Sequence, residues 1–163
     1  MIIKEKTTED NSWIVEYMER EWGGNFIITN GRMHYIEQLA GIILSENQKN
    51  IGICLYEEGN NECEIVLLEA FEKNKGVGTI LIKEMISRMK NMNWRRIWLI
   101  TTNDNLDAIR FYQRRKFRIN KINKNGIDKA RKLKHTIPLV GNYGIPIHDE
   151  IEMEYSNIEE KTD

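Results

Sequence analysis

Two short stretches carry residue types and spacings that could do chemistry on a phosphorylated ligand. The first contains Gly76 and Gly78, follows the apolar run at 65–68 and opens a long amphipathic segment that ends near Met92. A strand, a glycine turn and a helix gather backbone N–H groups at the helix N-terminus, where they can hold a phosphate. Glycine allows a positive φ and close approach of a ligand to the backbone. The stretch predicts a phosphate-binding turn, although a glycine pair can also serve tight packing alone.

The second stretch runs from Asn105 to Phe117 and reads NLDAIRFYQRRKF. It follows the expected strand Arg96–Thr102, and Asn105 is a good N-cap for a helix over 106–116. The stretch therefore predicts a second helix that begins at an N-cap.

The glycine stretch is neither G-x-G-x-x-G nor a P-loop, because no Lys-Ser/Thr pair follows the glycines. It resembles the Arg/Gln-x-x-Gly-x-Gly/Ala signature of the GNAT superfamily of acyl-CoA-dependent N-acyltransferases, with Lys73 in place of Arg or Gln. The second stretch resembles the second GNAT signature, Asn-x-x-Ala-x-x-Phe/Leu-Tyr-x-x-x-Gly-Phe, with Lys116 in place of Gly. The resemblance covers about 39–155, and the tail looks like that of a bacterial subgroup of unassigned substrate.

The resemblance implies an α/β (α+β) fold with a mixed, mostly antiparallel central sheet of six to seven strands, flanked by about four helices. Its fourth and fifth strands should be parallel and splayed. The pattern from Leu39 to Leu68 predicts an antiparallel meander, and the run at 97–100 predicts a strand buried on both faces. We expect one domain, 1–163, with an acceptor-side segment at 1–38, a motif-bearing core at 39–155 and a polar tail at 156–163.

The resemblance also implies that acetyl-CoA is the cosubstrate and that the glycine turn holds its pyrophosphate. A plain N-cap role for Asn105 and a packing role for Phe111 stay open. The residues expected to contact the cosubstrate are Leu68, Glu69, Ala70, Lys73, Asn74, Lys75, Gly76, Val77, Gly78, Thr79, Asn105, Ala108, Phe111 and Tyr112.

Acyl transfer from a thioester to an amine requires an acid for the thiolate, a base for the amine and a donor for the oxyanion. Tyr112 matches the usual general acid of the family, and a phenol of pKa about 10 can protonate a thiolate whose conjugate acid has a pKa of about 8.5. Backbone N–H groups at Leu68 to Ala70, where the family's strand bulges, are the expected oxyanion donors.

The base is open between Glu64, Glu69 and ordered water. Glu64 corresponds in position to the catalytic glutamate of histone-acetylating GNATs. Period-two alternation places Glu64 with Glu62, Val66 and Leu68 on one face of the strand. Glu69 lies past the expected bulge, and either glutamate could instead be a solvated strand residue.

Charge is unevenly distributed although the formal net charge is only −1. Residues 1–72 hold 14 acidic and 5 basic side chains, which mildly favours a cationic acceptor, whereas 110–135 hold 11 basic side chains and one acid. The basic segment could be a solvated face, a site for the CoA 3′-phosphate or a surface for an anionic partner. A nucleic acid is an unlikely partner, because no aromatic interleaving or nucleic-acid motif accompanies the charge.

The remaining composition predicts a cytoplasmic protein without a membrane span or signal peptide. The three histidines and the two cysteines show no metal-ligand spacing, so no metal is expected. A homodimer is possible. The sequence therefore favours an N-acetyltransferase acting on a primary amine of a small molecule or peptide through a ternary complex. The alternative is a CoA-binding GNAT module without turnover, which serves as a sensor or partner domain.

Overall fold

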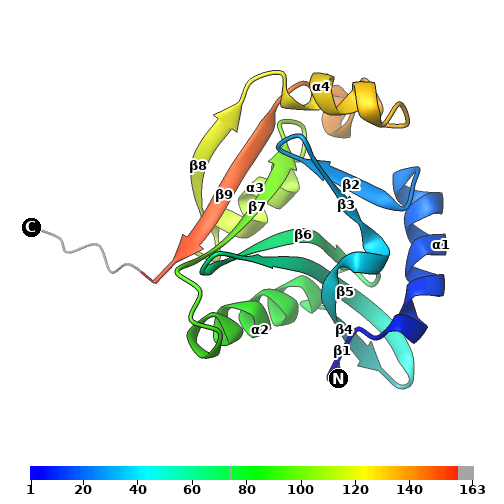
Figure 1. The fold of residues 1–163 in the computed structure, drawn as a ribbon, viewed down its shortest axis with the longest axis vertical. Coiled ribbons are helices and arrows are strands. Elements are labelled where there is room, and N and C mark those ends of the chain that lie inside the picture. Colours follow the sequence, from blue (N-terminus) through cyan, green and yellow to red (C-terminus); the bar gives the residue numbers. More distant parts are fainter. Residues whose placement is uncertain (74, 158–163) are drawn as a thin grey trace, which may run out of the picture.

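The computed structural model describes residues 1–73 and 75–157. A seven-stranded sheet has the order β1-β4-β5-β6-β7-β9-β8, and all neighbours are antiparallel except β6 and β7 (Figure 1). The expected mixed, mostly antiparallel sheet and the meander of its middle strands are thus confirmed. The strands are β1 (Ile2–Glu5), β4 (Ala40–Glu46), β5 (Lys49–Gly59), β6 (Glu62–Ala70), β7 (Arg96–Thr102), β8 (Arg118–Asn123) and β9 (Glu150–Ser156).

Helices cover both faces of the sheet, as the resemblance predicted. Helices α2 (Val77–Asn91) and α3 (Leu106–Gln113) pack on one face, and α1 (Asn11–Trp22) packs on the other. A hairpin of β2 (Phe26–Thr29) and β3 (Arg32–Tyr35) lies beside α1. Helix α4 (Gly126–Leu133) lies near the end of β8 and the start of β9. The sequence did not predict β3. None of the helices in the described residues is long and apolar enough to cross a membrane.

The hydrophobic stripe predicted for α2 is the main contact between helix and sheet. Its members recur every three or four residues, so they share one face. Against them pack core side chains of β5, β6 and β7. Each fully buried aliphatic side chain contributes about 1.5–3 kcal/mol to the free energy of unfolding. The buried residues of α2 are Val77, Leu81, Ile82, Met85 and Met89.

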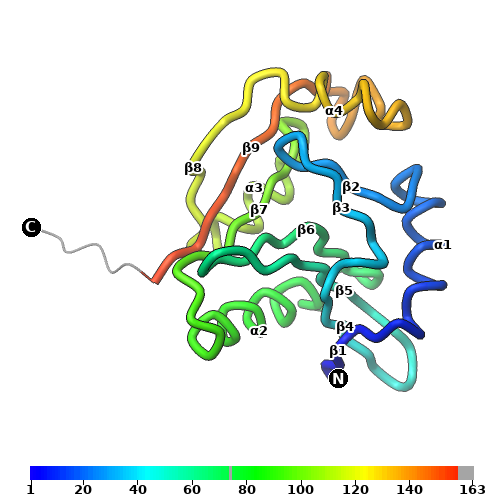
Figure 2. The backbone as a smooth tube through the Cα atoms, viewed as in Figure 1, coloured from blue at the N-terminus to red at the C-terminus, as the bar shows by residue number. Residues whose placement is uncertain are grey.

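Strands β6 and β7 pair over only four residues, from Glu62 opposite Arg96 to Ile65 opposite Leu99. Beyond that point they diverge, as the backbone trace shows (Figure 2). The predicted splay is therefore present. The prediction that β7 is buried on both faces is wrong, because burial alternates along it. Trp98 and Ile100 lie on one face of β7 and are only partly buried, whereas Ile97 and Leu99 on the other face are buried.

The bulge of β6 lies at Val66 and not at Leu68 to Ala70, where we expected it. Leu55 faces Leu67 and Tyr56 faces Ile65, so Val66 is the extra residue. A bulge reverses the alternation of the side chains that follow it. The predicted grouping of Leu68 with Glu64 is therefore wrong: Leu68 packs on the α2 side with Ile65, while Leu67 packs on the α1 side.

Helix α3 ends at Gln113, three residues before the predicted end, and the chain turns through Lys116 at φ 68°. This is the left-handed conformation that the family's glycine adopts without cost and that a Cβ disfavours by about 1 kcal/mol. Lys116 therefore adopts a positive φ at the position where the family signature has glycine.

We predict that Lys116→Gly raises the free energy of unfolding by about 0.5–1 kcal/mol, because it relieves this strain. Lys116→Ala removes the same charge but keeps the Cβ, so it should leave stability unchanged. Urea unfolding of the three proteins measures the difference, and equal midpoints for the Gly and Ala variants would contradict the assignment of strain.

Candidate active site

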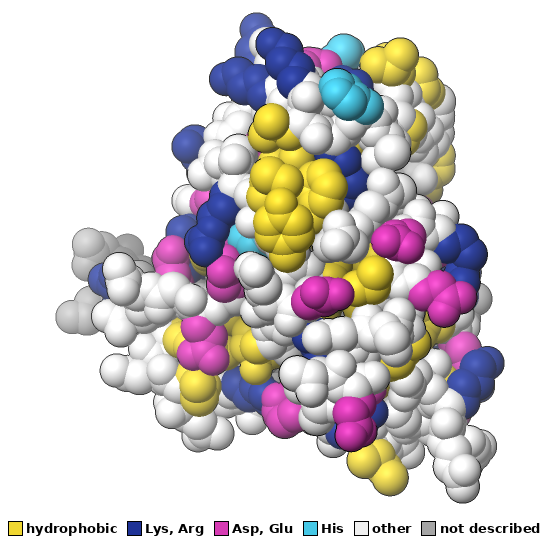
Figure 3. Space-filling model, turned by 45° about the vertical axis from the view of Figure 1, so that its right-hand side comes forward, with side chains coloured by type: hydrophobic (Ala, Val, Ile, Leu, Met, Phe, Trp, Pro, Cys, Tyr) yellow, Lys and Arg dark blue, Asp and Glu magenta, His cyan; other side chains and the backbone are white. Residues whose placement is uncertain are grey.

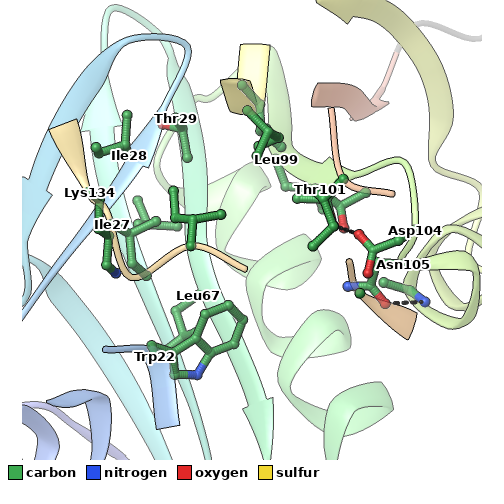
Figure 4. Close-up of a pocket in the computed structure, with 18 of the residues that line it drawn as sticks. Trp22, Ile27, Ile28, Thr29, Leu67, Leu99, Thr101, Asp104, Asn105 and Lys134 are labelled. Atoms are coloured by element: carbon green, nitrogen blue, oxygen red, sulfur yellow. Dashed lines mark hydrogen bonds between the residues drawn. The ribbon is translucent and has the colours of Figure 1, made fainter. Parts of the chain in front are cut away.

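A cavity of about 650 Å³ occupies the gap between the splayed strands (Figure 4). One wall is formed by β7 at 99–102 and by Asn105, Ala108 and Tyr112 of α3. The opposite wall is formed by β2 at 27–29, Trp22 and Lys134. The floor is β6 at 65–68, and the loop that carries Ile137, Pro138 and Asn142 closes one end. The helix of the second motif and the N-terminal segment thus both line the cavity, whereas none of the described residues of the glycine turn does.

The two glycines of the first motif have different physical roles. Gly76 precedes α2 and has a left-handed φ of 71°, which glycine adopts more easily than other residues. A Cβ there would meet no atom within 4 Å, so this position is open to solvent. A Cβ at Gly78 would lie 3.1 Å from the Phe111 ring, so this glycine allows α2 and α3 to approach. The turn therefore leaves the backbone at Gly76 open to a ligand, as a phosphate site requires.

The other members of the first motif divide between surface and core. Lys73 is exposed, and Lys75 forms an ion pair with Glu72 at 2.6 Å. Val77 is buried in the core, and Asn74 lies outside the described residues. The turn thus offers a phosphate its backbone and the Lys73 ammonium, while Lys75 is already paired.

Arg115 adds a cation to the first turn of α2 that sequence reasoning did not single out. Its guanidinium donates to Thr79 Oγ1 at 2.5 Å and to the Phe111 carbonyl at 2.8 Å, and it stacks 3.7 Å from the Phe111 ring centre. Its buried Nε has no hydrogen-bond partner within the described part of the chain. A run of basic residues in the sequence could not show which of them folds back onto α2.

Helix α3 presents one face to the cavity. The Asn105 side chain accepts a hydrogen bond from the Ala108 N–H at 3.3 Å, so it is an N-cap that also lines the cavity. Tyr112 is buried between Phe111 and Phe117 and borders the cavity. Phe111 faces α2, so its role is packing. Burial raises the pKa of Tyr112 above the ordinary value, and its hydroxyl has no hydrogen-bond partner among residues 1–73 and 75–157.

Glu64 lies directly behind the cavity wall. Only 5% of its surface is exposed, and Thr29, which lines the cavity, donates from Oγ1 to Glu64 Oε1 at 2.5 Å. Burial raises the pKa of Glu64 to about 7. The Thr29 hydrogen bond opposes this rise, and the nearby Glu57 carboxylate adds to it. A carboxyl group with a pKa near neutrality is suited to general base catalysis.

A chain of polar groups leads from Glu64 to the surface. His34 Nε2 is 2.7 Å from Thr29 Oγ1 and 3.5 Å from Glu64 Oε2, and His34 Nδ1 is 3.2 Å from Glu57 Oε2. Arg32 donates to Glu57 Oε1 at 2.8 Å at the protein surface. Burial lowers the pKa of His34, which favours the neutral ring. The β2–β3 hairpin assembles these groups, and its second strand, β3, was not predicted.

The same cluster brings three potential metal ligands together. Ligand atoms of His34, Glu57 and Glu64 all lie within 4.8 Å of one another, a grouping that the spacing of the histidines did not reveal. Each of the three already contacts another group of the cluster. The absence of a metal requirement stays a prediction.

Glu69 and its neighbours contribute less to the cavity than expected. Glu69 is on the α1 side, where burial raises the pKa of its carboxyl while Tyr17 and Trp22 stabilise the charged form. Leu68 lines the cavity, whereas Ala70 packs toward the core under α2. Past Ile65 no strand pairs with the β7-facing edge of β6, so backbone groups on this edge can bind a ligand.

The two thiols belong to the core and not to the cavity. Cys54 and Cys63 are fully buried within the cluster beneath α2, and burial raises the pKa of Cys54 to about 12. A thiol of that pKa is protonated at neutral pH and is a poor nucleophile. This geometry favours direct transfer over a covalent acyl-enzyme.

The Acetyltransferase (GNAT) family matches residues 6–117, which is more than half of the chain. Two relatives come from Bacillus subtilis (strain 168). "Uncharacterized protein YxbD" is 33% identical over 136 residues, with 83% of this chain and 86% of the relative covered. "Uncharacterized protein YdhI" is 35% identical over 139 residues, with 85% and 87% covered.

Solved structures of acetyltransferases share the fold. A GNAT acetyltransferase from Elizabethkingia anophelis with acetyl-CoA bound gives a TM-score of 0.72 at 20% identity, with 95% of this chain and 97% of that chain covered. A Bacillus subtilis acetyltransferase in complex with CoA gives 0.68 at 18% identity, with 94% and 97% covered. By sequence and by fold, the chain belongs to the GNAT family of acetyltransferases.

Proposed function

We propose that the protein transfers an acetyl group from acetyl-CoA to a primary amine by direct attack in a ternary complex. The observation that carries the proposal is the Tyr112 residue in the wall of the cavity between the splayed strands, whose hydroxyl has no hydrogen-bond partner among the described residues. Similar structures contain acetyl-CoA or CoA, which supports the choice of cosubstrate.

The cosubstrate would lie along the unpaired edge of β6, with its pyrophosphate at the backbone of the turn from Gly76 to Thr79. Helix N-termini favour anions because their N–H groups are unsatisfied and the helix dipole is positive there. Lys73 and Arg115 supply positive charge on the two sides of this turn. Asn105 and Ala108 would contact the part of the cosubstrate that enters the cavity.

The described residues support a complete proton balance for the reaction. The acceptor enters as an ammonium, and Glu64 takes its proton through the Thr29 hydroxyl, which also contacts His34 Nε2. The free amine attacks the thioester carbonyl, and backbone N–H groups of the β6 edge stabilise the oxyanion. The C–N bond forms and the C–S bond breaks. Tyr112 gives its proton to the leaving thiolate, and the second proton of the attacking nitrogen passes to the Tyr112 phenolate, so the products are the amide and the CoA thiol.

The acidic residues of the N-terminal half would attract an ammonium to the cavity. Figure 3 shows acidic side chains beside a hydrophobic patch on the face where α1 and the hairpin come forward. Exposed large hydrophobic residues of these elements include Trp22, Met33 and Tyr35. This surface suits an acceptor with an apolar body and a cationic amine.

Release of free CoA thiol from acetyl-CoA, measured with and without a panel of primary amines, tests the proposal. We expect thiol release that depends on the amine and an equivalent amount of acetylated product by mass spectrometry. Tight acetyl-CoA binding without turnover on any amine would instead indicate a CoA-binding module. Failure to bind acetyl-CoA would overturn both.

A further inference from the structure

Lys134 is a buried cation in the wall of the cavity. Only 7% of its surface is exposed, and its ammonium donates to the Phe26 carbonyl at 2.7 Å and lies 5.2 Å from the Phe26 ring centre. Within the described part of the chain no carboxylate pairs with it. An ammonium has three donors, and buried charges are normally paired because burying one alone is costly.

The other charged residues that line the cavity are already satisfied. The Asp104 carboxylate accepts from Thr102 Oγ1 and, at 2.8 Å, from the Asn142 N–H. Glu21 is paired with Arg20 at 2.8 Å near the surface. Neutral donors satisfy Asp104, whereas Lys134 is the cation of the described cavity wall and no carboxylate pairs with it. Burial also lowers the pKa of Lys134, as expected for an ammonium that no neighbouring anion stabilises.

From the proposed function, we infer that the acceptor amine carries an anionic group, such as a carboxylate, that pairs with Lys134. The Lys134 ammonium is held at Phe26, and Thr29 is three residues further along β2, about 10 Å at the usual strand rise. Figure 4 shows Lys134 and Thr29 on the same wall. The amine and the carboxylate of the acceptor are thus separated by several carbon atoms, as in an ω-amino acid or in the ε-amine and α-carboxylate of free lysine.

Three probes of equal length test the inference: 6-aminohexanoate, hexylamine and 1,6-diaminohexane, which end in a carboxylate, a methyl group and an ammonium. For the wild-type protein we expect kcat/KM for 6-aminohexanoate to exceed that for hexylamine by about 10- to 100-fold, as a charge-assisted hydrogen bond provides. In Lys134→Met the ratio should fall to about 1. In Lys134→Arg and in the exposed control Lys132→Met it should persist. Each ratio is internal to one protein, so a loss of folded protein does not change it.

Binding of hexanoate, which cannot be acetylated, gives a readout without turnover. Calorimetry should show hexanoate binding to the wild-type protein and at least 10-fold weaker binding to Lys134→Met. No binding to the wild-type protein, equal binding to both, or a preference for 1,6-diaminohexane would overturn the inference. Turnover of hexylamine without any carboxylate preference would overturn it while leaving the acetyltransferase proposal intact. Hexanoate binding to the wild-type protein without turnover of any amine would support the role of Lys134 but overturn the acetyltransferase proposal.

Discussion

Tyr112→Phe should lower kcat by about 100- to 1,000-fold while acetyl-CoA binding stays within about twofold of wild type. Tyr112 lines the cavity, its raised pKa keeps the phenol protonated, and general acid catalysis contributes about 10²–10⁴ in rate. The substitution removes one oxygen atom and no hydrogen bond of the described structure, so stability should change little. Steady-state kinetics and calorimetry with acetyl-CoA measure the two quantities.

Tyr155→Phe is the matched control for this loss. Tyr155 packs beside Phe117 at 5.7 Å between ring centres, in the same aromatic cluster, but it does not line the cavity. Its variant should keep wild-type kcat. An unchanged kcat in Tyr112→Phe would show that solvent or another group protonates the thiolate. Equal losses in both variants would attribute the effect to packing.

The second large effect is expected for Glu64→Gln, with kcat/KM at pH 7 lowered by about 100-fold. The base must be ionised to accept a proton, and the pKa of Glu64 is raised to about 7. Wild-type kcat/KM should therefore rise with pH up to about 7 and level off above it. The variant should lack this step, while Glu58→Gln, a neutralised exposed carboxyl on the neighbouring strand, should retain it.

The raised pKa of Glu64 should also make the free energy of unfolding depend on pH. Between pH 4.5 and about 7 the folded protein holds a proton on Glu64 that the unfolded chain has released, so the free energy of unfolding falls as pH rises. Relative to Glu64→Gln, the wild-type protein should lose about 2–3 kcal/mol between pH 5 and pH 8. Urea unfolding across this range measures the difference. A constant difference at all pH values would show that the pKa of Glu64 is not raised.

The sequence predicted the elements that local patterns determine. The hydrophobic stripe of α2, the left-handed Gly76 and the N-cap at Asn105 all follow from residue types within one turn of the chain. The splay of β6 and β7 came from the family resemblance. The bulge at Val66 was misplaced because its position depends on the register with β5, which no single strand encodes.

The polar groups behind the cavity could not be predicted for a related reason. Thr29 and His34 reach Glu64 only because a hairpin far away in the sequence folds onto β6. Lys134 was one of many basic residues in its segment, and its burial against Phe26 depends on contacts over more than 100 positions. Such features require the tertiary structure, since they have no local signature.

The central claim is that the glycine turn holds acetyl-CoA, and the midpoint of thermal unfolding tests it most directly. Acetyl-CoA at about 100 times its Kd should add roughly 2.7 kcal/mol and raise the midpoint by about 5–10 °C. Gly76→Glu places a side chain and a negative charge at the phosphate position and should abolish the shift. Gly31→Glu should preserve it, since Gly31 has φ 75° and the same open surroundings but lies in the β2–β3 turn. No shift in the wild-type protein, or an undiminished shift in Gly76→Glu, would contradict the account.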